Sequence, residues 1–407
     1  MATSNDDLVA LARQRLYANY KPAPLAMVRG SGCELFDADG RRWLDLCAGV
    51  AVCSVGHAHP TLVRAIAEQA ARVMHVSNYF YNEQNIRLAD ELCRRTGFAR
   101  AFFCNSGTEA NEALLKLARH RFFLAGQKDR VRIVAFDNAF HGRTLGALSM
   151  TATPKYRTGF GPLGPVTHVP YGDADAVERA MGSDVAAIVV EPLQGEGGVV
   201  PAPPGFLARL RAIADAHGAL LLVDEVQTGI GRLGRFLGSE GSGAKPDAIA
   251  LAKGLGGGFP VGAMLTTEAV AGALPPGSHG STFGGNPLAS AAARAVLRIV
   301  DEEQLVEGAR IKGEALGVML DDLVRQLPDT CEAARGEGLL RGLVLKPGFV
   351  ARDLLQSVQE AGVLLTAAGE RVLRFSPPLV VSVAELEEGV AAIRTALAGQ
   401  GRLKSVG

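Results

Sequence analysis

Short apolar segments recur between residues 101 and 266, and each is followed by a loop or by a helical pattern. Apolar runs of this kind, without strict alternation, are typical of strands that are buried on both faces of a sheet. Because the segments alternate with helices, the pattern predicts a mostly parallel sheet with helices on both sides. The six predicted strands are residues 101–104, 132–136, 186–190, 219–223, 248–252 and 262–266.

The spacing of apolar and polar residues is different before and after this region. Residues 25–47 alternate polar and apolar positions around a turn at residues 37–40, which predicts short antiparallel strands. The remaining pattern predicts helices at 6–20, 62–76, 85–96, 288–303, 305–326, 352–361 and 383–397, and strands at 338–345 and 373–375. We therefore predict an α/β protein with a large domain at 56–285 and a smaller α+β domain at 286–407, to which the N-terminal segment 1–55 contributes.

Composition and charge narrow the classes of function. The 407 residues include 42 Lys plus Arg and 42 Asp plus Glu, so the net charge is zero and predicts no nucleic-acid binding. No apolar stretch is long enough to span a membrane, and the N-terminal residues lack a secretory signal. We therefore expect a cytoplasmic protein, or an organellar one without its transit peptide. The six cysteines form no CxxC pair, so neither a metal site nor a disulfide framework is expected, and Cys104 reads as a small buried apolar residue.

Lys253 ends the predicted strand 248–252 and runs directly into the glycine-rich residues 254–258. In α/β sheets ligands bind at the carboxyl ends of strands, so this position is a candidate for chemistry. An apolar environment lowers the pKa of a lysine and makes it a Schiff-base nucleophile. A dinucleotide fingerprint is not supported, because Pro260 interrupts the helix that such a motif needs.

Asp224 ends another apolar strand, at residues 219–223. A carboxylate there can pair with a protonated pyridine nitrogen, and Gln227 could hydrogen-bond a hydroxyl on the same ring. The alternative is a metal-binding carboxylate of the Walker B type. No GxxxxGK[ST] motif precedes it, so this alternative fails.

Two further segments offer groups for anions. Ser106, Gly107 and Thr108 open a strong helical pattern, where backbone N–H groups can bind phosphate, although Ser106 also fits an ordinary helix cap. Ser281 and Thr282 are candidates for a second phosphate contact.

Aromatic and charged residues complete the candidate site. Phe140 could stack on a ring, Arg143 could bind a carboxylate, and His141 is more often structural than catalytic. Arg374 lies between apolar residues and needs a partner, for which Glu196 is the candidate.

Several motifs share one order along the chain, at residues 106–112, 140–143, 191–198, 224–229, 252–258 and 281–287. Together they resemble the class III aminotransferases, most closely those of the acetylornithine type, from residue 30 to residue 396. The resemblance implies an aspartate-aminotransferase-like fold of type I, with pyridoxal phosphate as cofactor. It also implies a homodimer with its active sites at the subunit interface.

The resemblance also implies roles for single residues. Lys253 would hold the cofactor covalently. The cofactor would further contact Ser106, Gly107, Thr108, Phe140, Asp224, Val226 and Gln227, together with the partner's Thr282. Arg143 and Ser281 would hold acetylornithine and Arg374 the α-carboxylate of 2-oxoglutarate, while Glu196 would neutralise Arg374 when the donor is bound.

The amino donor is the most open part of this prediction. Val50 stands where ornithine aminotransferases carry a tyrosine, which favours an acylated donor such as acetylornithine. Succinylornithine, succinyl-diaminopimelate, ornithine and 4-aminobutyrate remain alternatives, as does a mutase, decarboxylase or racemase on the same scaffold. A non-catalytic relative would be expected to lose Lys253, Asp224 or the phosphate motif, and all three are present.

Overall fold

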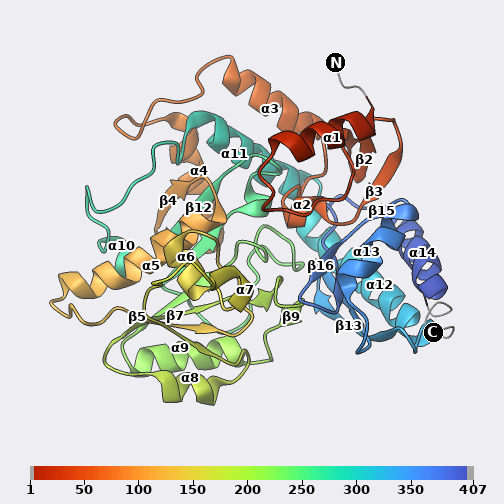
Figure 1. The fold of residues 1–407 in the computed structure, drawn as a ribbon. Coiled ribbons are helices and arrows are strands. Elements are labelled where there is room, and N and C mark those ends of the chain that lie inside the picture. Colours follow the sequence, from red (N-terminus) through yellow and green to blue (C-terminus); the bar gives the residue numbers. More distant parts are fainter. Residues whose placement is uncertain (1–3, 401–407) are drawn as a thin grey trace.

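A seven-stranded sheet organises the larger part of the chain in the computed structural model, which describes residues 4–400 (Figure 1). Its strand order is β4-β12-β11-β10-β7-β5-β6, and β12 runs antiparallel to both of its neighbours. The predicted mostly parallel sheet is therefore confirmed. The strands are β4 (Arg100–Cys104), β5 (Arg132–Phe136), β6 (Val166–Val169), β7 (Val185–Val190), β10 (Leu220–Asp224), β11 (Ala248–Leu251) and β12 (Gly262–Thr266).

Successive residues of the central strands pack into two different apolar cores. Leu222 of β10 belongs to one cluster with Leu114, whereas its neighbour Leu221 belongs to the other with Leu210. Leu114 lies on α5 (Gly107–Leu124) and Leu210 on α9 (Phe206–Ala216), so both faces of the sheet are covered. Each fully buried leucine contributes about 1.5–3 kcal/mol, which accounts for the scarcity of polar side chains on these strands.

Two four-stranded sheets make up the rest of the fold. One joins β1 (Met27–Ser31), β2 (Glu34–Asp37) and β3 (Arg42–Asp45) to β15 (Val363–Leu364). The other has the order β13 (Cys331–Glu337), β14 (Leu340–Leu345), β17 (Val372–Phe375) and β16 (Thr366–Ala368). The predicted antiparallel strands within 25–47 are confirmed. The parallel pairing of β3 with β15 joins these N-terminal strands to the C-terminal part of the chain (Figure 1).

The helices follow local start and stop signals. The Asn82 side chain caps α4 (Glu83–Thr96), which ends at Gly97 in the left-handed conformation. Asn286 and Pro287 open α11 (Pro287–Glu302) in the same way. The other long helices are α1 (Asn5–Arg15), α3 (Pro60–Ala70), α12 (Leu305–Gln326), α13 (Ala351–Glu360) and α14 (Val383–Gln400). The shorter elements are α2 (Ala48–Ala51), α6 (Leu145–Met150), α7 (Pro154–Arg157), α8 (Ala174–Ala180), β8 (Leu193–Gln194), β9 (Val200–Pro201), η1 (Lys253–Leu255) and α10 (Glu268–Ala271). Within residues 4–400, no helix is long and apolar enough to cross a membrane.

Two predicted helices were too long, and the strands β6 and β13 were not predicted. The first helix ends at Arg15 rather than at residue 20, because two prolines follow at 22 and 24. The helix predicted at 62–76 ends at Ala70, where the Gln69 side chain donates to the Val73 carbonyl and closes the last turn. Strands β6 and β13 were missed because polar residues interrupt their apolar positions.

Gly313 on α12 tests how closely this helix packs on the strands beneath it. A Cβ at Gly313 would lie 2.2 Å from the Gly338 carbonyl oxygen, and backbone cannot move aside. Gly313→Ala is expected to destabilise the protein by about 1–3 kcal/mol through overpacking. Gly308→Ala on the same helix meets only the flexible end of Lys312, at 3.4 Å. It should stabilise the helix by up to about 1 kcal/mol. Thermal unfolding of both variants is the measurement, and equal melting temperatures would contradict the close packing.

Candidate active site

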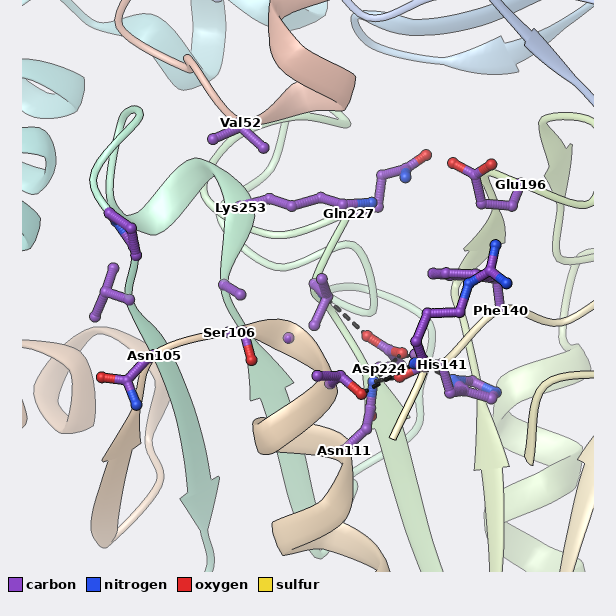
Figure 2. A pocket seen from close by; sticks show the side chains of 18 of the residues that line it. Val52, Asn105, Ser106, Asn111, Phe140, His141, Glu196, Asp224, Gln227 and Lys253 are labelled. Atoms are coloured by element: carbon purple, nitrogen blue, oxygen red, sulfur yellow. Dashed lines mark hydrogen bonds and ion pairs between the residues drawn. The ribbon is translucent and has the colours of Figure 1, made fainter. Parts of the chain in front are cut away.

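A cavity of about 380 Å³ opens at the carboxyl ends of the central strands (Figure 2). Its volume lies within the range of small-molecule sites. Ten of the predicted site residues line it: Ser106, Gly107, Thr108, Phe140, Arg143, Glu196, Asp224, Val226, Gln227 and Lys253. The sheet topology brings them together, because they follow strands that end at the same edge.

Lys253 follows β11 after a single residue, Ala252, and begins the turn η1. Its φ of 29° is unfavourable for a residue with a side chain, and such strain is typical of functional sites. Figure 2 shows the Lys253 side chain extending across the cavity towards Gln227. Burial lowers the pKa of the Lys253 amine, although the negative charge of Glu196 works in the opposite direction.

Asp224 forms the floor of the cavity and is held by three neighbours. Its Oδ2 accepts a hydrogen bond from Asn111 Nδ2 at 2.7 Å and lies 2.8 Å from His141 Nδ1. Its Oδ1 accepts from the Val226 backbone N–H at 2.9 Å. His141 is buried, and its Nδ1 lies against the carboxylate that faces the cavity. The sequence analysis favoured a structural role for His141, and the structure adds that this residue orients Asp224.

Asn111 was missed by the sequence analysis, although a signal was available. It lies four residues after Gly107 on α5, and residues four apart share one face of a helix. Its side-chain amide donates both to Asp224 and to the His141 carbonyl, the latter at 2.8 Å. Asn111 therefore ties the start of α5 to the floor of the cavity.

At the N-terminus of α5, backbone N–H groups rather than side-chain hydroxyls are available to bind an anion. Ser106 caps the helix, with its Oγ accepting from the Glu109 N–H at 3.3 Å, so the capping interpretation holds for its side chain. The Thr108 hydroxyl accepts from the N–H groups of Arg143 and Thr144, at 3.1 and 3.2 Å. An anion at this helix start would therefore meet the N–H groups of the first turn.

Ser281 and Thr282 do not line the cavity within this chain. Ser281 Oγ accepts from Asn105 Nδ2 at 3.2 Å and from the Gly284 N–H at 3.1 Å, which places it behind Asn105. Thr282 is exposed. Neither residue lines the cavity beside Gly107 in the single chain, so a phosphate contact by Thr282 needs a second subunit.

Glu196 and Arg374 form the ion pair that the sequence predicted. Arg374 is only 2% exposed, so its charge is almost fully removed from water. Its Nε donates to Thr366 Oγ1 at 3.1 Å, and Gln227 Oε1 lies 3.4 Å from its Nη1. Although burial raises the pKa of Glu196, the positive charges of Arg374 and Lys253 bring it below its ordinary value.

Phe140 and Arg143 line the cavity, and both pack against Tyr156. The rings of Phe140 and Tyr156 meet edge to face at 5.9 Å, and the Arg143 guanidinium lies 3.7 Å from the centre of the Tyr156 ring. Arg143 is exposed and lines the cavity. It can therefore reach a ligand carboxylate at the entrance.

Glu191 and Val50 differ from the expectation. Glu191 begins the motif at residues 191–198 and was given no role of its own, yet its buried Oε2 has no hydrogen-bond partner within the described residues. Burial, and then the charge of Asp224, raise the pKa of Glu191 well above its ordinary value. Val50 was expected to favour an acylated amino donor. It is not among the residues that line the cavity, whereas Val52 is.

Cys104 agrees with the expectation of a buried apolar residue. It is 2% exposed, and burial raises the pKa of its thiol to about 12. All six cysteines of the chain are free. Within residues 4–400, no group of three or more metal-ligating side chains gathers in one place.

Comparisons with known proteins agree with this geometry. The chain is 48% identical over 387 residues to the acetylornithine aminotransferase of Myxococcus xanthus, which covers 95% of this chain and 96% of that one. It is 44% identical over 383 residues to the succinylornithine transaminase/acetylornithine aminotransferase of Pseudomonas aeruginosa, with 93% and 94% covered. The ornithine aminotransferase structure from Toxoplasma gondii superposes with a TM-score of 0.94 at 32% identity, covering 98% of this chain and 96% of that chain. The family model for class-III aminotransferases matches residues 16–397, and the chain belongs to this family.

Proposed function

We propose that this chain transfers the δ-amino group of acetylornithine to 2-oxoglutarate, with pyridoxal phosphate held on Lys253. The products would be N-acetylglutamate 5-semialdehyde and glutamate, in a step of arginine biosynthesis. The observation that carries the proposal is that Lys253, Asp224 and Glu196 line one cavity, and that Glu196 is paired with Arg374, which is buried behind the cavity lining. The names of the Myxococcus and Pseudomonas relatives support the choice of donor.

Pyridoxal phosphate fits the residues that line the cavity. A Cβ at Gly107 would come within 2.7 Å of Val226, so only glycine leaves room where the helix start meets the cavity. The first turn of α5 suits the phosphate, and Asp224 can face the ring nitrogen. When it is bound, the cofactor supplies an electron sink that makes amino-group transfer possible.

Lys253 would provide both the attachment point and the proton carrier. Because burial lowers the pKa of its amine, more of the Nζ is uncharged and nucleophilic near neutral pH. The same Nζ can accept a proton from the donor carbon that bears the amine, and would deliver that proton to the cofactor rather than back to the donor. Asp224 is held in place by Asn111, His141 and Val226, so it needs little rearrangement to bind a ring N–H.

The Glu196–Arg374 pair would let one cavity accept two different substrates. The α-carboxylate of 2-oxoglutarate lies beside its reacting carbon and can pair with Arg374. The terminal amine of acetylornithine has no neighbouring carboxylate, and Glu196 then keeps the buried Arg374 charge paired. Arg143, at the entrance, would hold the distant carboxylate of the donor.

Other donors and reactions remain alternatives within this framework. Succinylornithine appears in the name of the Pseudomonas relative and differs from acetylornithine only in its acyl group. A mutase or decarboxylase would use the same cofactor, yet it would have less need for a paired arginine that serves two substrates. The proposed aminotransferase is therefore the better fit to Glu196 and Arg374.

We further infer a homodimer, in a reducing compartment such as the cytoplasm. Tyr79 and Tyr81 are 92% and 95% exposed, as expected of an interface rather than of a free surface. Asn78 donates to the carbonyls of Ser281 and Gly284, which holds this aromatic loop beside the Thr282 segment. The six free cysteines suit a reducing environment.

The charges around Lys253 predict opposite effects of two substitutions. Glu196→Gln removes a negative charge that raises the pKa of Lys253, so this pKa should fall. Arg374→Gln removes a positive charge that lowers it, so the pKa should rise. The pH dependence of Lys253 labelling by trinitrobenzenesulfonate in the cofactor-free protein gives the pKa. Glu302→Gln, on the exposed surface of α11, serves as the control. Shifts in the same direction would contradict the arrangement of charges.

A donor panel tests the reaction itself. Acetylornithine, succinylornithine, ornithine, 4-aminobutyrate and succinyl-diaminopimelate are each supplied with 2-oxoglutarate, and acetylornithine should give the highest kcat/KM. Arg143→Ala should raise the KM for acetylornithine about tenfold through the lost charged hydrogen bond. Arg157→Ala, outside the cavity, should leave it unchanged. An unchanged KM in Arg143→Ala would refute the role of Arg143.

Assembly can be tested at the aromatic loop. The double variant Tyr79→Ser and Tyr81→Ser is expected to shift the protein towards the monomer and to weaken cofactor binding, because the phosphate would lose the partner's Thr282. Val318→Ser is the control, since Val318 is 61% exposed on α12. Sedimentation and cofactor titration are the measurements. A variant that stays dimeric would place the interface elsewhere.

A further inference from the structure

Four consecutive residues before Val52 adopt positive φ values. Ala48, Gly49, Val50 and Ala51 have φ values of 48°, 62°, 66° and 63°. Residues with a Cβ adopt this left-handed region singly and rarely, because the Cβ approaches the following carbonyl. A run of four needs contacts that hold it in place.

Asp45 and His57 lie before and after this segment; Asp45 holds its start, and His57 holds Asp45. Asp45 is fully buried, and its Oδ1 accepts from the N–H groups of Cys47 and Ala48, at 2.9 and 2.8 Å. Its Oδ2 lies 2.6 Å from His57 Nε2. His57 is itself fixed by two backbone hydrogen bonds with Gly32, at 2.8 and 3.0 Å.

Both members of the pair are charged near neutral pH. The hydrogen bond to Asp45, followed by the contact with Cys53, raises the pKa of His57 to about 9. Burial alone would raise the pKa of Asp45, but the hydrogen bond from His57 brings it below its ordinary value. A buried charged pair of this kind is costly to break from one side.

The segment held by this pair contacts both halves of the active site. Ser54 Oγ donates to the Gly254 carbonyl at 2.7 Å, next to Lys253. Ser376 Oγ donates to the Cys47 carbonyl at 3.0 Å, two residues after Arg374. Val52 follows the left-handed run directly and lies across the cavity from Asp224 (Figure 2).

We propose that Asp45 and His57 are positioning residues, which hold the left-handed turn at residues 48–51 and so fix the Val52 wall against which the amino donor binds. The choice of acetylornithine as that donor rests on the proposed function. Acetylornithine is longer than 2-oxoglutarate and carries an acyl group, so its binding depends more on the Val52 wall. Loss of the pair should therefore weaken binding of the amino donor more than binding of 2-oxoglutarate.

The test compares His57→Gln and Asp45→Asn with His59→Gln. His59 lies two residues from His57 and makes a similar contact with Glu303, at 2.8 Å, but it caps α3 outside the cavity. In the two pair variants the KM for acetylornithine should rise about tenfold, while the KM for 2-oxoglutarate changes by less than about threefold. Amide hydrogen exchange at residues 47–53 should accelerate in these variants, and His59→Gln should change neither quantity.

Several outcomes would overturn the proposal. Exchange at residues 47–53 that stays as slow as in the unaltered protein would show that the pair does not hold the turn. Equal increases of both KM values would show a general structural loss instead of a positioning role. Melting temperature and cofactor absorbance identify variants that are merely misfolded, and His57→Gln, which keeps a hydrogen-bonding side chain, is the decisive one if Asp45→Asn does not fold.

The proposed donor and the positioning role can fail separately. If the unaltered protein does not use acetylornithine, the donor proposal is wrong, and the KM comparison is made with the best donor of the panel. The exchange measurement needs no substrate at all. It therefore decides whether the pair holds the turn, whatever the outcome of the donor panel.

Discussion

Adjacent parallel strands end at the same edge of a sheet, and the active site depends on this constraint. β10 and β11 are paired so that Asp224 lies opposite Ala250, three residues before Lys253. The apolar residues that bury both strands therefore also fix the separation of the carboxylate and the amine. Side chains that the chain could not bring together by local structure meet because the two cores on either side of the sheet hold the strands in register.

The charged side chains near this edge of the sheet lie close enough together to influence one another. Glu196, Arg374 and Lys253 lie close together, so that the charges of Arg374 and Lys253 lower the pKa of Glu196, while Glu196 raises and Arg374 lowers the pKa of Lys253. Removing one partner from such a group leaves an uncompensated charge, which is why the cluster behaves as a unit. Asp224 differs, because hydrogen bonds from neutral groups and its contact with His141 orient it.

The central strands and Lys253 could be predicted from the sequence because short unbroken apolar runs, bounded by turn residues, are stable only where both faces of a strand are buried. Strand β13 could not, since its residues are mostly polar and it is stabilised by pairing with β14. Among the site residues, Arg374 revealed its need for a partner through its apolar neighbours. The contacts of Asn111 and His141 with Asp224 could not be predicted, because they join residues that are 113 and 83 positions apart in the sequence. The Val52 wall depends on positive φ values at alanines and a valine, which sequence patterns do not predict.

The pairing of β3 with β15 has a consequence for the order of folding during synthesis. β3 ends at Asp45, whereas β15 begins at Val363, so the N-terminal hairpin must wait for more than three-quarters of the chain to emerge from the ribosome. The seven strands of the large sheet are all complete by Thr266 and can associate earlier. Val52 and Arg374 both lie outside that sheet. Lys253 and Asp224 can therefore be in place before the pairing of β3 with β15 fixes the segments that carry Val52 and Arg374, and a released but unfinished chain would lack the part of the site proposed to select substrates.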